Sequence, residues 1–147
     1  MKRSGLVFTG ANNFWSGAQQ PEDMDDGILT AAEIARMNLQ TTSLVVMSAC
    51  QSGLGEVTGE GVFGLQRAFK KAGVSSLLIS LWEVDDQATQ LMMTRFYQAL
   101  TEGKTKQQAL ATAQAAVRTQ RFTSSDGSIH SGAEPYYWAA FVLMDAD

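Results

Sequence analysis

The sequence is poor in cysteine, histidine and proline, with one, one and two of these among 147 residues. A single cysteine cannot form an internal disulfide, which favours a reducing, cytoplasmic setting over a secreted protein with a free thiol. No apolar run is long enough to cross a bilayer, and no signal-peptide pattern is visible, so no membrane association is expected. The net charge of −4, without a basic stripe, also argues against nucleic acid as a partner.

Apolar runs alternate with amphipathic stretches and predict an α/β fold in a single domain. Strands are expected near residues 6–9, 44–49, 75–82 and 138–144. Helices are expected at 31–37, at 61–72, from Asp85 or Asp86 to Gly103, and from Thr105 onward. Thr30 with Glu33 and Thr105 with Gln108 have the spacing of capping boxes. This alternation predicts a mostly parallel sheet with helices on both faces. A loop is expected over residues 122–135, before the last strand.

The only cysteine, Cys50, stands where a nucleophile is useful. It ends the predicted strand 44–49 and precedes a glycine-rich turn, a position that lies in the ligand crevice of open α/β sheets. A thiolate needs a nearby base or cation to act on a carbonyl group. The only histidine, His130, lies far downstream in a polar segment, which is typical of a surface residue. Cys50 is therefore a candidate nucleophile without an evident base, and a buried structural cysteine is the alternative.

Segments spread over most of the chain resemble the CHAT domain, a caspase-like cysteine peptidase family often joined to tetratricopeptide repeats. They are residues 26–34, 44–55, 59–61, 68–69, 80–89, 96–97 and 136–141. The resemblance implies a caspase-like three-layer sandwich, of which residues 1–147 form a partial domain. It implies a peptide or protein substrate, an association with tetratricopeptide repeats, and no cofactor or metal.

The family's chemistry uses a histidine in a His-Gly motif and a cysteine after the next strand. Cys50, within Ser-Ala-Cys-Gln-Ser-Gly, matches the cysteine, whereas the His-Gly motif would precede residues 3–6. We therefore expect an upstream segment to supply the histidine and this chain alone to be inactive. We also expect the exposed sheet edge to promote self-association. A non-catalytic binding module derived from a CHAT domain is the alternative, and an unrelated α/β domain is a third reading.

Three acidic residues, Glu83, Asp85 and Asp86, follow the predicted strand 75–82. The carboxyl ends of parallel strands share one edge of a sheet, so these residues are expected near Cys50 and would select a basic side chain before the scissile bond. By resemblance, Asp86 matches the last acid of a similar pattern in separases. The alternative is that Asp85 or Asp86 caps the next helix. Trp82 and Trp138 are expected to be packing anchors.

Overall fold

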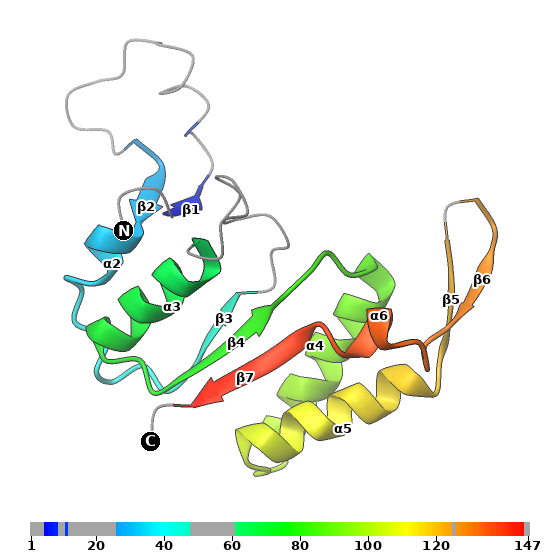
Figure 1. Cartoon of the computed structure of the whole chain (residues 1–147). Coiled ribbons are helices and arrows are strands. Elements are labelled where there is room, and N and C mark those ends of the chain that lie inside the picture. Colours follow the sequence, from blue (N-terminus) through cyan, green and yellow to red (C-terminus); the bar gives the residue numbers. More distant parts are fainter. Residues whose placement is uncertain (1–4, 9–10, 12–25, 48–60, 125, 146–147) are drawn as a thin grey trace. The chain divides into compact units, whose positions relative to one another are not determined.

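The structure is a computed structural model that describes residues 5–8, 11, 26–47, 61–124 and 126–145 (Figure 1). The chain divides into two compact units. The first includes the described residues up to Val45 together with residues 61–75. The second includes residues 46–47 and 76–145. Helices and strands occur in both units, which confirms the α/β class, while the three-layer sandwich and the single partial domain remain predictions.

The first unit combines a short antiparallel strand pair with two helices. β1 (Gly5–Val7) pairs with β2 (Ile28–Thr30), and Leu6 lies opposite Leu29. α2 (Ala31–Ile34) follows β2 directly, and α3 (Gly61–Ala72) packs against it. The buried apolar side chains of this unit are Ala11, Ala31, Ile34, Leu65, Ala68, Phe69, Ala72 and Val74. The predicted helix over residues 61–72 is confirmed.

Helix boundaries in this unit follow the predicted capping pattern. The Glu33 N–H donates to Thr30 Oγ1 over 3.3 Å, and the Thr30 N–H donates to Glu33 Oε2 over 2.8 Å. Each bond satisfies a backbone donor that the helix itself leaves without a partner. α3 ends at Ala72, and the next residue, Gly73, has a φ of +102°, in the left-handed region that favours glycine. The capping box at Thr30 is therefore confirmed, although α2 is shorter than the predicted 31–37.

The sheet of the second unit has three strands in the order β3–β4–β7. They are β3 (Val45–Met47), β4 (Ser76–Ser80) and β7 (Phe141–Asp145). Figure 1 shows β3 and β4 running in the same direction and β7 in the opposite one, with Ser80 paired to Phe141 at the carboxyl end of β4. Leu77, Leu78 and Ile79 are all buried, and because neighbouring residues of a strand face opposite sides, both faces of β4 are covered.

The expectation of a mostly parallel sheet is wrong for the described pairings, because β7 is antiparallel to β4 and β1 to β2. The direction of β7 is explained by α4 (Asp86–Thr101) and α5 (Lys106–Arg118), which lie between β4 and β7 in the sequence and pack together as a helical hairpin. A single crossover helix returns the chain to the end where a strand began. Two successive helices return it instead to the end where β4 finished, so the next strand runs backward.

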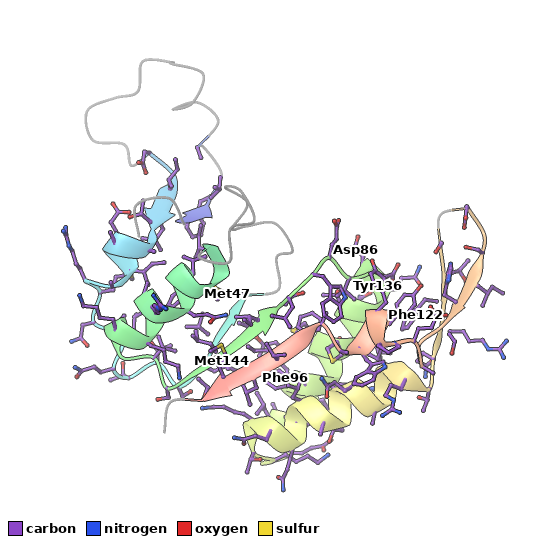
Figure 2. All side chains as sticks on the ribbon, in the orientation of Figure 1. Met47, Asp86, Phe96, Phe122, Tyr136 and Met144 are labelled. Carbon is purple, nitrogen blue, oxygen red and sulfur yellow. The ribbon has the colours of Figure 1, made fainter. Side chains whose placement is uncertain are left out.

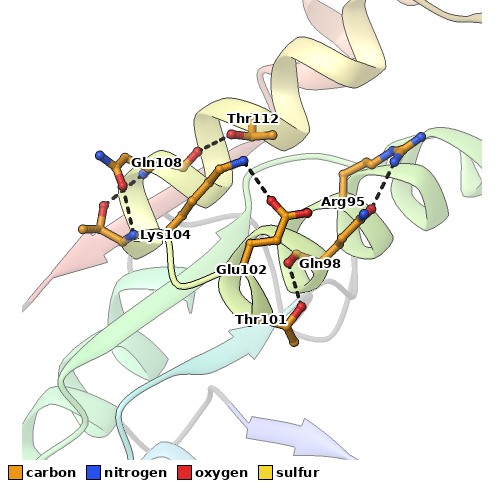
Figure 3. A network of polar contacts seen from close by, with 8 residues as sticks. Arg95, Gln98, Thr101, Glu102, Lys104, Gln108 and Thr112 are labelled. Atoms are coloured by element: carbon orange, nitrogen blue, oxygen red, sulfur yellow. Dashed lines mark hydrogen bonds and ion pairs between the residues drawn. The ribbon is translucent and has the colours of Figure 1, made fainter.

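α4 and α5 pack through small and apolar side chains. The buried residues are Ala88, Met92, Phe96 and Ala99 of α4, and Ala109, Leu110, Ala113 and Val117 of α5. Figure 3 shows the polar contacts around their connection, including the ion pair of Lys104 with Glu102 at 3.2 Å. The Thr105–Gln108 capping box is present at the start of α5 and confirms its prediction. None of the described helices is both long enough and apolar enough to cross a membrane.

The region predicted as a loop contains a β-hairpin and a short helix. β5 (Arg121–Thr123) pairs with β6 (Ile129–Ser131), and α6 (Pro135–Trp138) precedes β7. Three-residue strands provide too few residues for a reliable alternating pattern. The predicted strand 138–144 also starts too early, because Trp138 belongs to α6.

Candidate functional site

The connection from β4 to α4 is held in place at several points. The Leu81 N–H donates to the carbonyl oxygen of Ala140 over 2.9 Å. Ser80 Oγ donates to the carbonyl oxygen of Trp82 over 2.6 Å. The side chain of Val84 is buried beneath this connection. Together these contacts position residues 81–86 at the carboxyl end of β4, which is where the sequence predicts the acidic site residues.

The three predicted acids have different environments. Asp85 is the N-cap of α4, and its Oδ1 accepts hydrogen bonds from the N–H groups of Gln87 and Ala88 at 2.9 and 3.1 Å. The capping alternative is thus confirmed for Asp85. Asp86 is the first residue of α4 and projects away from the ribbon in Figure 2. Its exposed carboxylate makes no hydrogen bond or ion pair with any other described residue, and Glu83 is also exposed.

The predicted nucleophile, Cys50, lies outside the described residues. β3 ends at Met47, three positions before Cys50 in the sequence, and β3 is the neighbour of β4 in the sheet. The proximity of Cys50 to the acidic residues was predicted because the carboxyl ends of parallel strands share one edge of a sheet. That proximity, and the role of Cys50, remain predictions.

His130 lies in β6 and is half-buried, so its assignment to a polar surface loop is wrong. Its Nε2 lies 2.8 Å from Ser128 Oγ, and that hydroxyl donates to Asp126 Oδ1 over 2.6 Å. A serine hydroxyl has one hydrogen, which here goes to the carboxylate, so the imidazole must be the donor in the other contact. His130 therefore does not act as a base toward Ser128, although the three residue types are those of a hydrolase triad.

Hydrogen bonds within this hairpin turn affect the acidity of Asp126. The hydroxyl of Ser128, and then its backbone N–H, lower the pKa of Asp126 below its ordinary 3.8. The His130 side chain also favours the carboxylate, as a smaller contribution. Across the part of the chain that the structure describes, no three or more Asp, Glu, His or Cys side chains gather as metal ligands.

Sequence reasoning missed the two tyrosines of α6. Tyr136 is 47% exposed, and its carbonyl oxygen accepts a hydrogen bond from Trp82 Nε1 at 3.0 Å. Tyr137 is buried, and burial raises the pKa of its hydroxyl, with smaller contributions from the charges of Glu134 and Asp85. The run Tyr-Tyr-Trp after Pro135 was a usable signal, because proline is favoured in the first turn of a helix.

The two tryptophans described differ from each other. Trp138 is a packing anchor as predicted: its Nε1 donates to the carbonyl oxygen of Ala133 over 3.2 Å, and the guanidinium carbon of Arg118 lies 4.8 Å from its ring centroid. Trp82 is fixed through Nε1 to Tyr136, yet 37% of its surface is exposed. Trp82 is therefore only partly an anchor, and it presents aromatic surface beside the acidic residues.

Comparison with known proteins identifies relatives over most of the chain. Tetratricopeptide repeat protein 28 of Homo sapiens is 33% identical over 120 residues, which are 82% of this chain and 4% of that protein. Tetratricopeptide repeat protein 28 of Mus musculus is 32% identical over the same shares. The chain thus corresponds to a small part of these relatives. No solved structure matches significantly. The CHAT domain profile matches residues 1–146, and the chain belongs to the CHAT domain family.

Proposed function

We propose that this chain is the cysteine-bearing part of a caspase-like cysteine endopeptidase, with Cys50 as its nucleophile. The observation that carries the proposal is the CHAT match over residues 1–146. By resemblance, Cys50 within Ser-Ala-Cys-Gln-Ser-Gly corresponds to the family's cysteine, and it follows β3 by three positions in the sequence. The thiolate of Cys50 attacks the carbonyl carbon of the scissile peptide bond, and its own backbone N–H stabilises the developing oxyanion. The carbon–nitrogen bond then breaks as the leaving amine takes a proton from a histidine, and water hydrolyses the resulting thioester to regenerate Cys50.

The proposal requires that histidine to come from another segment. His130, the only histidine here, donates to Ser128 and does not stand at the family's histidine position. Loss of either a base or an oxyanion donor lowers rates by about 10²–10⁴. We therefore expect negligible turnover from these 147 residues alone.

Asp86 is the best candidate among the three acids for selecting a basic substrate residue. Asp85 is already engaged by two backbone N–H groups, whereas Asp86 is exposed and without a described partner. β3 and β4 are neighbours with the same direction, which favours a shared edge for Cys50 and Asp86. A carboxylate there pairs with an arginine or lysine side chain through charge-assisted hydrogen bonds. Glu83 contributes to the same negative field.

The test uses a full-length protein that carries this domain together with the His-Gly segment. Peptides with arginine, lysine or glutamate before the scissile bond are assayed with Cys50→Ala and Asp86→Lys variants. We expect Cys50→Ala to abolish hydrolysis and Asp86→Lys to remove the preference for basic residues. Glu102→Lys, at an exposed acid between α4 and α5, is the matched control for charge reversal. Hydrolysis that survives Cys50→Ala contradicts the proposal.

A non-catalytic binding module is the second candidate, because the one histidine of this sequence, His130, does not stand at the family's histidine position. Both relatives are named tetratricopeptide repeat protein 28, which supports an association of this domain with tetratricopeptide repeats. Alkylation separates the two functions: a Cys50 that iodoacetamide labels only after denaturation supports the binding module. In this reading the full-length protein binds peptides without cleaving them.

Self-association and a cytoplasmic setting are also part of the proposal. Within the described sheet, β3 and β7 are the outer strands, and an unpaired strand edge favours pairing with a second copy. Light scattering across a wide concentration range tests this point, because a constant monomer mass contradicts it. The single cysteine is consistent with a reducing compartment.

A further inference from the structure

An exposed aromatic pair lies at the start of the acidic connection. Trp82 and Tyr136 come from segments far apart in the sequence and are joined by the Trp82 Nε1 hydrogen bond to the Tyr136 carbonyl oxygen. Tyr136 is further held by the ring of Tyr137, which meets it edge-on with centroids 5.1 Å apart. The hydrogen bond fixes the indole at Nε1, and the contact with Tyr137 orients the ring of Tyr136, while both residues stay substantially exposed to solvent.

Trp138, in the same protein, shows which side chain can stack on a tryptophan ring held in this way. Its Nε1 is also bonded to a backbone carbonyl, and the guanidinium of Arg118 lies over its ring at 4.8 Å from the centroid. Trp82 is held in the same way. Among the described residues, however, no cationic side chain covers the ring of Trp82. The comparison indicates an arrangement suited to binding an arginine side chain.

The charges around the pair attract a cation. Glu83 and Asp86 are one and four residues beyond Trp82, and both are exposed. Glu134 is exposed two residues before Tyr136. The charges of Glu134 and Asp85 both contribute to the raised pKa of Tyr137, which places their negative field at α6. An exposed aromatic pair within a negative field is complementary to a guanidinium group.

We propose that Trp82 and Tyr136, together with Asp86, bind the guanidinium group of an arginine side chain and select arginine over lysine. A planar guanidinium stacks on aromatic faces and pairs with a carboxylate through two parallel hydrogen bonds, whereas an ammonium group is compact and more strongly hydrated. The inference rests on the proposed function only in taking the ligand to be a substrate peptide. It adds two aromatic specificity-determining residues and a distinction between two basic side chains.

The experiment measures binding, so that it does not depend on catalysis. A full-length Cys50→Ala protein is titrated calorimetrically with a blocked tetrapeptide containing one arginine, and with its lysine twin. We expect the arginine peptide to bind about three- to tenfold more tightly, the range that one cation–π contact typically gives. Tyr136→Leu is expected to bring the ratio close to one, and Tyr136→Phe to preserve it because the aromatic face remains.

Two further variants separate recognition from folding. Tyr97→Leu removes a tyrosine of nearly equal exposure, 48%, on α4 and is expected to leave the ratio unchanged. Trp82→Phe keeps an aromatic ring without the Nε1 donor and is expected to weaken arginine binding with little change in melting temperature. Equal binding of the two peptides, or a ratio unaffected by Tyr136→Leu, overturns the inference. Equal cleavage of arginine and lysine substrates overturns it too, while leaving the peptidase proposal intact.

Discussion

The ring of Tyr137 stacks on the ring of Phe122, with centroids 5.1 Å apart and planes inclined by 23°. Phe122 belongs to β5 and Tyr137 to α6, so this contact joins the hairpin to the helix that carries Tyr136. A second link is the hydrogen bond from Gln87 Nε2 at the start of α4 to the carbonyl oxygen of Thr123 at 3.2 Å. The hairpin therefore supports both elements that present the candidate site.

The first prediction concerns this aromatic contact. Phe122→Ala removes a buried ring and leaves Tyr137 without its stacking partner. We expect the free energy of unfolding to fall by about 3–5 kcal/mol. Urea denaturation followed by circular dichroism measures the change. Ile129→Ala, on the same hairpin but at a residue 67% exposed, is the control and is expected to change stability by less than about 0.5 kcal/mol. Similar losses for the two variants contradict the supporting role of Phe122.

Local sequence signals predicted the helices well. Thr30 and Thr105 each cap a helix through the expected pair of bonds, and Gly73 ends α3, because these interactions involve residues within a few positions of one another. The direction of β7 was not predictable in this way. It depends on the pairing of Ser80 with Phe141, sixty-one positions apart, and on the helical hairpin between them. Pairing over such a separation is decided by tertiary packing.

A second prediction follows from the close approach of Gly132 to the end of α5. A Cβ atom at this position would collide with the carbonyl oxygen of Val117 and would lie 2.9 Å from that of Gln120. Both obstacles are backbone atoms, so the hairpin must shift to accommodate a methyl group. We expect Gly132→Ala to lower stability by about 1–3 kcal/mol, the usual cost of overpacking.

Thermal melting measures the effect of Gly132→Ala, and Gly127→Asn is its control. Gly127 has a φ of +83°, and a Cβ atom there would meet no other atom within 4 Å. Asparagine tolerates this left-handed region. Gly127→Asn is therefore expected to cost less than Gly132→Ala. A Gly132→Ala protein with an unchanged melting temperature shows that the contact with Val117 is not tight.

The third prediction separates the two adjacent acids of α4. Asp85 satisfies two N–H groups of the first helical turn, so Asp85→Ala is expected to cost about 1 kcal/mol of stability. Asp86 has no hydrogen-bond or ion-pair partner among the described residues and lies in the first turn of α4, where a carboxylate is stabilised by the helix dipole. Asp86→Ala is therefore expected to cost about 0.3–1 kcal/mol, reduced by salt. For peptide binding we expect the opposite: Asp86→Ala weakens the affinity more than Asp85→Ala does. If Asp85→Ala weakens binding more than Asp86→Ala at equal salt, Asp86 is not the ligand-binding acid.

The candidate site was only partly predictable. The acids after β4 were found from the sequence because they follow an apolar strand, and the capping role of Asp85 was among the alternatives. Tyr136 was missed, since its place beside Trp82 depends on a contact across 54 positions. The hydrogen bonds that link the side chains of Asp126, Ser128 and His130 were missed as well, because these side chains come together only when β5 and β6 form a tight hairpin.

The fourth prediction is a pH dependence in this hairpin turn. The hydroxyl and N–H groups of Ser128 hold the pKa of Asp126 below 3.8 in the folded protein. The folded state therefore binds this proton more weakly than the unfolded state does. The resulting stabilisation is fully present above about pH 3.8, and it is lost as the pH falls through the lowered value.

An NMR titration of the side-chain carboxyl carbons tests this origin of the shift. Ser128→Ala removes the largest contribution, the hydroxyl, and is expected to move the pKa of Asp126 back toward 3.8 while the backbone N–H keeps part of the shift. Glu33 is a control within the same titration, because bonds from Thr30 in another unit lower its pKa, and Ser128→Ala must leave it unchanged. An Asp126 pKa that stays low in Ser128→Ala assigns the shift to the backbone and to His130 instead.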